Sequence, residues 1–277
     1  MKKNERAAAI VRTIVVSLIA VLFVVPLVWM VLFSLKTAPE VFARPFHWLP
    51  ARVQWQNYAT VWMNEEASML RAFANTLYIA LFSIIGQMFI SSLAAYSFAK
   101  INFKGKQVVF MLFLSSMMVP SQLTIIPRFM LFKTIGLYNN LWAIILPAFF
   151  GATSIFMLRQ FYMGLPNDLI EAAKIDGAGH LRIFLRIMLP LTKAALMSLI
   201  ILAFISSWNE YMAPLIFLVK KELYTVSQNI QWYMLDEFKE HNLTMAAATS
   251  AIVPVVILFI VGQKYFVEGI ATSGVKG

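Results

Sequence analysis

The sequence predicts an all-α, polytopic membrane protein with six transmembrane helices and a folded loop between the fourth and the fifth. Two observations carry this prediction. Sixty per cent of the 277 residues are apolar and only 13% are charged, whereas a soluble domain carries about 25% charged residues. Charges also divide the chain into six apolar segments of 21–28 residues, and a helix needs about 20 residues to cross the hydrocarbon of a bilayer.

Each apolar segment is bounded by charged or strongly polar residues; the six are 13–35, 72–99, 107–127, 134–158, 194–219 and 242–263. Backbone polar groups find no water in hydrocarbon, so each segment is expected to be a helix. The first segment is longer than the roughly 7–15 apolar residues of a secretion signal, which predicts a retained membrane helix. Residues 1–12 and 268–277 are expected to be tails of a single transmembrane domain, 13–267.

Six spans would place both termini on one side of the membrane. The segments on that side carry fourteen Lys and Arg residues and those on the other side carry nine. Cytoplasmic loops carry the excess of Lys and Arg, so both termini are predicted to be cytoplasmic. The outer segments 36–71 and 220–241 contain several aromatic residues, which suit either the membrane surface or contact with an external protein.

Several function classes are excluded by what the sequence lacks. The net charge is +10, but the basic residues flank spans instead of forming a patch on a folded domain, so no nucleic-acid partner is expected. Cysteine is absent and His47, His180 and His241 are far apart, so no metal site is expected. The chain has no GxxxxGK[ST] phosphate loop, and no catalytic residue is predicted.

A polar stretch, 159–193, separates the fourth and fifth apolar segments. Pro166 and Asn167 should end the preceding helix. Asp168 is then expected to cap a new helix, with Glu171 three residues later completing a capping box. Gly177 should end that helix, because glycine accepts the left-handed conformation of a helix end.

Further along this stretch, Gly179 is a second flexible point and an amphipathic turn follows. One face of the turn is basic, and the other is expected to hold Leu181, Phe184, Leu185 and Met188. The stretch is therefore predicted to form two short helices joined at glycine. Residue patterns leave two interpretations open: a connector at the membrane surface, or a docking surface smoothed by Ala172 and Ala173.

These residues carry a resemblance to a known family. The pattern and its place before the penultimate span resemble the EAA loop of importer-type ABC permeases; it consists of Glu171, Ala172, Ala173, Gly177, Ile187, Leu189 and Pro190. Trp208, Asn209, Glu210 and Tyr211, followed by Pro214, are similar to a span of carbohydrate permeases. The end of the chain, 263–277, resembles the smaller membrane subunit of maltose-type transporters, and the similarity covers essentially the whole chain.

The resemblance implies a permease subunit of a binding-protein-dependent ABC importer in a bacterial plasma membrane, and no enzyme activity in this chain. Implied partners are a homologous second permease subunit, two ATP-binding subunits, an extracytoplasmic sugar-binding protein and membrane lipid. ATP and Mg would be bound by the ATP-binding subunits, and this chain would hold no cofactor. The residues implied to couple it to the ATPase are Glu171, Ala172, Ala173, Asp176, Gly177, Ile187, Leu189 and Pro190.

Glu210 is the one acidic residue clearly inside an expected span. A carboxylate at bilayer depth costs about 2.5–3.5 kcal/mol, so it should face water or the interior of the helix bundle. Pro214 removes the N–H that would bond to the Glu210 carbonyl, which predicts a kink. Together with Trp208, Asn209 and Tyr211, Glu210 is either a point on the substrate path or a contact with a neighbouring helix or subunit.

Other classes fit the sequence less well. A secondary transporter driven by an ion gradient could use Glu210 as a proton or cation site, but it would leave the long inner loop unexplained. A membrane enzyme would need convergent reactive groups, which are scattered here. Among importers, a polyol or glycerol-phosphate cargo is the alternative to a sugar or oligosaccharide. A phosphate should require basic groups on the path, and none lies within the fifth segment.

Overall fold

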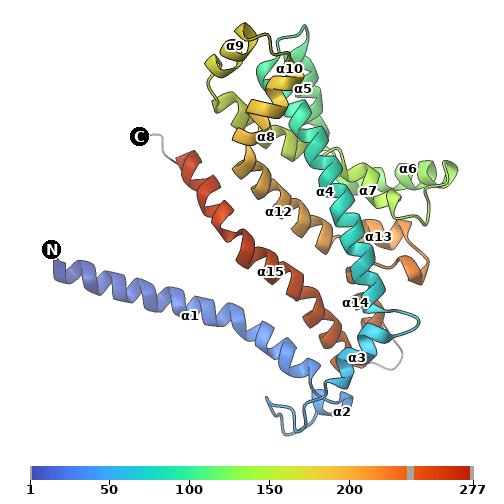
Figure 1. The fold of residues 1–277 in the computed structure, drawn as a ribbon. Coiled ribbons are helices and arrows are strands. Elements are labelled where there is room, and N and C mark those ends of the chain that lie inside the picture. The colour runs from blue at the N-terminus through green and yellow to red at the C-terminus, as the bar shows by residue number, and fades with distance from the viewer. Residues whose placement is uncertain (1, 236–239, 275–277) are drawn as a thin grey trace. The chain divides into compact units, whose positions relative to one another are not determined.

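The structure, a computed structural model, describes the backbone of residues 2–235 and 240–274 and the side chains of residues 8–235 and 240–263. All regular elements in these ranges are helices (Figure 1). The chain divides into two compact units, one formed by residues 1–70 and 229–253 and the other by residues 71–228 and 254–277.

The first unit contains three helices of its own: α1 (Lys2–Ser34), α2 (Ala38–Val41) and α3 (Gln56–Met63). Helices α14 (Val226–Leu235) and α15 (His241–Gly274) contribute to both units. After α1, the Lys36 side chain is 1% exposed. Its Nζ donates to the His47 carbonyl and lies 4.2 Å from the centre of the Phe33 ring. The shortness of α2 and α3 agrees with the prolines of this region, which prevent a long helix.

The second unit holds the remaining helices. In chain order they are α4 (Met69–Lys100), α5 (Lys106–Ser115), the 3-10 turn η1 (Ser116–Met118), α6 (Ser121–Thr134), α7 (Trp142–Ala148), α8 (Ala152–Gly164), α9 (Asp168–Ile175), α10 (His180–Ile183), the π-helical turn η2 (Phe184–Met188), α11 (Leu189–Leu191), α12 (Lys193–Asn209), α13 (Met212–Phe217) and the 3-10 turn η3 (Lys221–Leu223). Figure 1 shows α9 and α10 at one end of α4, and α6, α7 and α13 farther along it.

Four stretches in the described residues are long and apolar enough to cross a membrane; they are Ala8–Ser34, Met69–Lys100, Trp142–Gly164 and His241–Gln263. Two bent pairs raise the number to as many as six, and these are Lys106–Met118 with Ser121–Thr134, bent by 96°, and His180–Leu191 with Lys193–Asn209, bent by 76°. The prediction of an all-α membrane protein is therefore confirmed.

The third predicted segment, 107–127, is not one straight helix. Val119 has an extended backbone (ψ 112°) and the next helix begins only after Pro120. The proline ring disfavours a helical conformation in the residue before it, and the two halves meet at 96°.

The fifth predicted segment, 194–219, is also broken. Helix α12 ends at Asn209, and Glu210 is extended with ψ 125°. The expected kink is thus a full break, centred on Glu210. Pro214 lies in the first turn of the short helix α13, where a missing N–H is tolerated.

Several helices extend beyond the charges that were expected to bound the apolar segments; α1, for example, already begins at Lys2. Helix α8 continues past Arg159 to Gly164; the Arg159 guanidinium lies 4.1 Å from the centre of the Phe110 ring, and its Nε donates to the Phe98 carbonyl at 3.3 Å. Helix α15 continues to Gly274, so residues 268–274 of the predicted tail are helical, and residues 275–277 lie outside the described residues.

Two apolar clusters hold the second unit together. One joins the end of α4 to α8, α9, η2 and α12, and its buried members include Tyr96, Tyr162, Ile170 and Phe184. The other joins α4 to α6, α7 and α13, with Ile79, Phe132, Ile145 and Phe217 buried. The first cluster supports α9, and the second supports one wall of a polar pocket.

Candidate functional site

Helix α9 begins one residue earlier than the sequence suggests. Its N-cap is Asn167, and no side chain caps it, so the predicted capping box of Asp168 and Glu171 is wrong. The Asn167 side chain is engaged elsewhere, since Lys100 Nζ donates to its Oδ1 at 2.6 Å and to the Leu165 carbonyl at 2.7 Å. The end of α4 thereby fixes the start of α9.

The end of α9 agrees with the prediction. Gly177 has φ +76°, a conformation that costs an L side chain about 1–2 kcal/mol. The Gly177 N–H donates to the Lys174 carbonyl at 3.0 Å, and the Ala178 N–H donates to the Ala173 carbonyl at 2.9 Å. These two bonds make a Schellman motif, which satisfies carbonyls that the helix end would leave open.

The two faces of α9 differ from the expected ones. Ile170 and Ala173 are buried at 5% and 8% exposure in the cluster beneath the helix. Glu171 and Ala172 are exposed, and so is Ile175, at 87%. Ala172 and Ala173 therefore do not form one smooth docking face, because only the first faces outward.

After α9, the apolar face of the second turn also differs from the prediction. Ile183, Phe184 and Met188 are buried, whereas Leu181 and Leu185 are exposed. The turn η2 is π-helical, and the Leu189 N–H donates to the Phe184 carbonyl five residues back. Pro190 follows directly; it lacks an N–H, and its ring would clash with a regular helix four residues back.

Of the other predicted coupling residues, Ile187 and Leu189 are half-buried and Asp176 and Pro190 are exposed.

A second link ties this loop to α4. The Tyr96 hydroxyl and His180 Nδ1 are 3.1 Å apart, and the Tyr96 ring packs against Phe184. Together with the Lys100 bonds, this connects the chain on both sides of α9 to α4.

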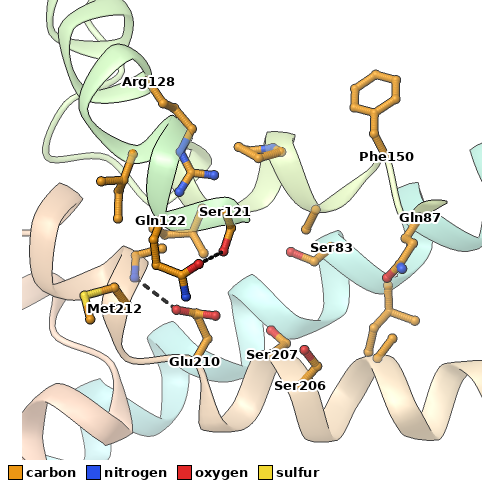
Figure 2. Close-up of a pocket in the computed structure, with 18 residues that line it drawn as sticks. Ser83, Gln87, Ser121, Gln122, Arg128, Phe150, Ser206, Ser207, Glu210 and Met212 are labelled. Carbon is orange, nitrogen blue, oxygen red and sulfur yellow. Dashed lines mark hydrogen bonds between the residues drawn. The ribbon is translucent and has the colours of Figure 1, made fainter. Parts of the chain in front are cut away.

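A polar pocket of about 430 Å³ lies farther along α4 (Figure 2). Its polar lining side chains come from α4, α6, α12 and the break after α12; they are Ser83, Gln87, Ser121, Gln122, Arg128, Ser206, Ser207 and Glu210. The break between α7 and α8 adds Phe150 and Gly151. Irregular backbone at membrane depth is tolerated where it lines a cavity, and three of the helix breaks meet here.

Glu210 forms the floor of this pocket in the view of Figure 2. Its Oε1 accepts a hydrogen bond from the Ala213 N–H at 3.0 Å. The carboxylate thus satisfies an open donor at the start of α13, which stabilises the break. No hydrogen bond from the described residues reaches Oε2.

Arg128 lies on the opposite wall, with the Gln122 side chain between it and Glu210 in Figure 2. Its guanidinium lies 4.9 Å from the centre of the buried Phe217 ring and attracts the Glu210 carboxylate. Its Nε is buried and has no hydrogen-bond partner among the described residues. The pocket therefore contains one formal charge of each sign.

Of the four predicted substrate-path residues, the pocket includes Glu210 alone. Trp208 is 2% exposed and packs against the rings of Phe73 and Phe204. Asn209 is exposed, and its Nδ2 donates to the Ile205 carbonyl at 2.8 Å. Tyr211 is half-buried. Trp208 stabilises the end of α12 and does not line the pocket.

Sequence reasoning missed Arg128 because it was assigned to the edge of a span; the search for basic groups covered only the fifth segment, whereas Arg128 lies at the end of the third. The available signal was a set of polar residues inside or beside apolar segments, among them Gln87 and Gln122. Polar residues in membrane helices usually face the bundle interior or a cavity. Their separation along the chain gave no indication that they meet.

Comparisons with known proteins agree with this architecture. Residues 87–272 match the family model described as "binding-protein-dependent transport system inner membrane component". The arabinooligosaccharides transport system permease protein AraQ of Bacillus subtilis is 33% identical, over 96% of this chain and 95% of that protein. The melibiose/raffinose/stachyose import permease protein MelC of the same species is 30% identical over 96% of each chain.

One further relative and one solved structure are also similar to this chain. The sn-glycerol-3-phosphate transport system permease protein UgpE of Escherichia coli is 30% identical over 84% of this chain and 85% of that protein. A solved bacterial ABC transporter involved in the import of the acidic polysaccharide alginate shares the fold, with TM-score 0.84, 23% identity and coverage of 95% of this chain and 98% of that one. The chain belongs to the family of inner-membrane permease components of binding-protein-dependent ABC transport systems.

Proposed function

We propose that this chain helps to move a sugar or oligosaccharide into the cytoplasm by ATP-driven alternating access. The named cargoes of its similar relatives include arabinooligosaccharides and melibiose, raffinose or stachyose. The hydroxyl, amide and charged groups of the pocket are suited to binding hydroxyl groups. Alternating access requires only that each ligand bind one of two conformations more tightly than the other.

In the assembled importer, the chain would cross the membrane six times, with both bent pairs acting as single spans and both termini in the cytoplasm. It would pair with a homologous permease subunit and receive cargo from an extracytoplasmic sugar-binding protein. Two partner subunits would bind ATP and Mg and hydrolyse the nucleotide. The loop 159–193, which corresponds to the predicted EAA loop, would face them.

The observation that carries this proposal is the exposed helix α9, held at both ends. Lys100 fixes its start and Gly177 its end, while Glu171, Ala172 and Ile175 face outward. An isoleucine that is 87% exposed on a rigid helix supports contact with another protein. Through α4, the same helix is linked to the pocket side of the unit.

A glycerol-phosphate or polyol cargo is the second candidate. The relative UgpE is named for sn-glycerol 3-phosphate, and Arg128 supplies a basic group in the pocket. A transporter driven by an ion gradient would also have a place for Glu210, but it would give α9 no role. ATP-independent uptake by the chain without partner subunits would favour that class.

Cross-linking between α9 and the ATPase tests the proposal, since the chain has no cysteine of its own. Ala172→Cys is paired with single cysteines in the cleft of the candidate ATP-binding subunit, in the complete importer. A disulfide whose yield changes with ATP is expected. Ala173→Cys is the matched control, because that side chain is buried and should react poorly. The absence of cross-links at both Ala172 and Ile175, in correctly inserted protein, would contradict docking.

A further inference from the structure

We propose that the pocket around Glu210 is a cargo subsite selective for an uncharged, hydroxyl-rich molecule, that Arg128 is one of its hydrogen-bonding residues, and that Glu210 determines this specificity by repelling anions. The inference rests on the proposed function and deepens it. It assigns part of the cargo recognition to this chain, and it distinguishes between the neutral and anionic cargoes that remain open.

The pocket has the size and composition of a binding site. Its volume of about 430 Å³ falls within the roughly 300–1,000 Å³ of small-molecule sites, in which a few polar groups orient the ligand. The apolar part of the lining includes Ile84, Ile125 and Ile144, which can pack against the C–H groups of a sugar. Phe150 lies at one end, with its ring directed away from the polar side chains (Figure 2).

Two polar atoms point to a missing ligand. Ser83 is 4% exposed and lines the pocket, and no side chain or backbone group in the described part of the chain bonds to its Oγ. Arg128 Nε is likewise buried and has no partner in that part of the chain. A buried polar group without a partner is costly, so the two atoms indicate that a hydroxyl-bearing molecule completes their hydrogen bonds when cargo is present.

The charges decide which cargo fits. An uncharged polyol can accept hydrogen bonds from Arg128 and donate them to the Oε2 of Glu210 at no electrostatic cost. A phosphate or carboxylate that bound Arg128 would enter the same pocket as the Glu210 carboxylate and be repelled by it. Because the two charges cancel, the pocket offers no net attraction to an anion.

Uptake by intact cells tests this inference. A strain of the native host that lacks this chain is complemented with the wild type or a variant and supplied with labelled probes. Raffinose and arabinotriose are the neutral probes; glycerol 3-phosphate and an alginate trisaccharide are the anionic probes. The wild type is expected to support uptake of a neutral probe in preference to either anionic one.

The decisive variants are Glu210→Gln and Arg128→Gln. An amide at position 210 still accepts the Ala213 N–H, so the break after α12 should persist. Each variant should lower neutral uptake by about tenfold, because each removes a charged hydrogen-bonding group from the pocket. The ratio of anionic to neutral uptake should rise in Glu210→Gln and should not rise in Arg128→Gln.

Matched controls separate recognition from folding. Lys133→Gln removes an exposed positive charge from the same helix, α6, and Glu222→Gln removes an exposed negative charge, both outside the pocket. Both should leave uptake and its selectivity unchanged, at membrane levels equal to the wild type. If Arg128 and Glu210 only stabilised the fold, both pocket variants would reduce the uptake of every probe in equal proportion. That result would overturn the inference.

A binding measurement tests the preference for a neutral cargo without depending on transport. Ser206→Cys places a thiol in the pocket of an otherwise cysteine-free chain. In the complete importer, its alkylation should be slowed by the neutral probe and not by glycerol 3-phosphate. Equal protection by both probes, or protection by neither, would count against a neutral-cargo subsite.

The outcomes also distinguish this inference from the proposed function. Neutral uptake that requires the chain but is unchanged in both pocket variants would overturn the subsite and leave the importer proposal intact. Uptake of anionic probes alone would overturn the selectivity argument and favour the glycerol-phosphate alternative. If no probe requires the chain, both the cargo class and the subsite are wrong.

Discussion

The loop around α9 and the pocket around Glu210 differ in the distance along the chain from which each is built. The end of α9 depends on hydrogen bonds that span three to five residues, between positions 173 and 178. The pocket brings together side chains from residue 83 to residue 213. The comparison shows why one site can be predicted from a short motif, whereas the other becomes visible only when the helices are packed.

Among the variants that follow, the largest effect is expected from Gly177→Val, at the end of α9. A β-branched side chain at φ +76° costs about 1–2 kcal/mol, which corresponds to a roughly tenfold shift away from the formed helix end. We expect uptake to fall by about this factor or more while ATP hydrolysis continues, because α9 no longer keeps its position. Uptake and ATPase rates of the complete importer are the measurement.

Gly179→Ala is the control for this variant, since Gly179 has no positive φ and a Cβ there meets nothing within 4 Å. It should behave as the wild type. Normal uptake in Gly177→Val would show that the loop does not depend on its Schellman motif.

A smaller effect is expected from Lys100→Met. This variant tests whether the loop around α9 also depends on hydrogen bonds to α4, which is distant in the sequence. The variant removes the two bonds from Nζ to Leu165 and Asn167. Hydrogen bonds to a charged group contribute about 1.5–3 kcal/mol each before solvent exposure reduces them, so a several-fold loss of uptake per ATP is expected. The exposed Lys104 provides the control as Lys104→Met. Equal uptake per ATP in the two variants would show that α9 does not depend on its bonds to α4.

Gly151→Ala tests the pocket with a single methyl group. The new Cβ would lie 2.1 Å from Gln87 Nε2, which donates to Ser154 at 3.0 Å. The flexible Gln87 side chain should move, at a cost of about 0.5–1 kcal/mol. The expected result is a KM for cargo raised by roughly two- to fivefold, with normal protein levels. Gly164→Ala, where a Cβ meets nothing within 4 Å, should leave KM unchanged.

The smallest effect is expected at Glu40, which forms a capping box with Thr37, three residues earlier in the chain. Its Oε2 accepts from the Thr37 N–H at 2.9 Å and its Oε1 from the Ala51 N–H at 3.1 Å. The Thr37 N–H is the main cause of the lowered pKa of Glu40. A lowered folded-state pKa adds stability above the unfolded-state pKa, and this stability is lost as the pH falls through the folded-state pKa.

Glu40→Gln should therefore lower the thermal midpoint slightly at pH 7, by the equivalent of about 0.5 kcal/mol for a solvent-exposed group. The difference from the wild type should shrink toward pH 3. Thermal unfolding of the purified protein at both pH values, with Glu222→Gln as the control, measures it. A difference that is independent of pH would assign the effect to packing.

The same contrast explains what could be predicted of the coupling residues. The turn at Gly177 followed from residue type, because only glycine takes φ +76° at low cost. The cap at Asp168 did not follow, because α9 begins one residue earlier with Asn167 at its N-cap, and the Asn167 side chain is bonded to Lys100. Which of Ala172 and Ala173 faces outward depends on the cluster beneath α9, and composition alone gives no information on that orientation.

The sequence alone determined the membrane environment, the helical class, the family motif and the helix end at Gly177. Each of these depends on residue type or on contacts within a few positions. The tertiary structure decided that the fifth segment breaks fully at Glu210 instead of kinking, that Trp208 is buried, and that Arg128 and Glu210 share a pocket. Those features depend on helices from distant parts of the chain packing together, and the free energy of that packing is not encoded in any single segment.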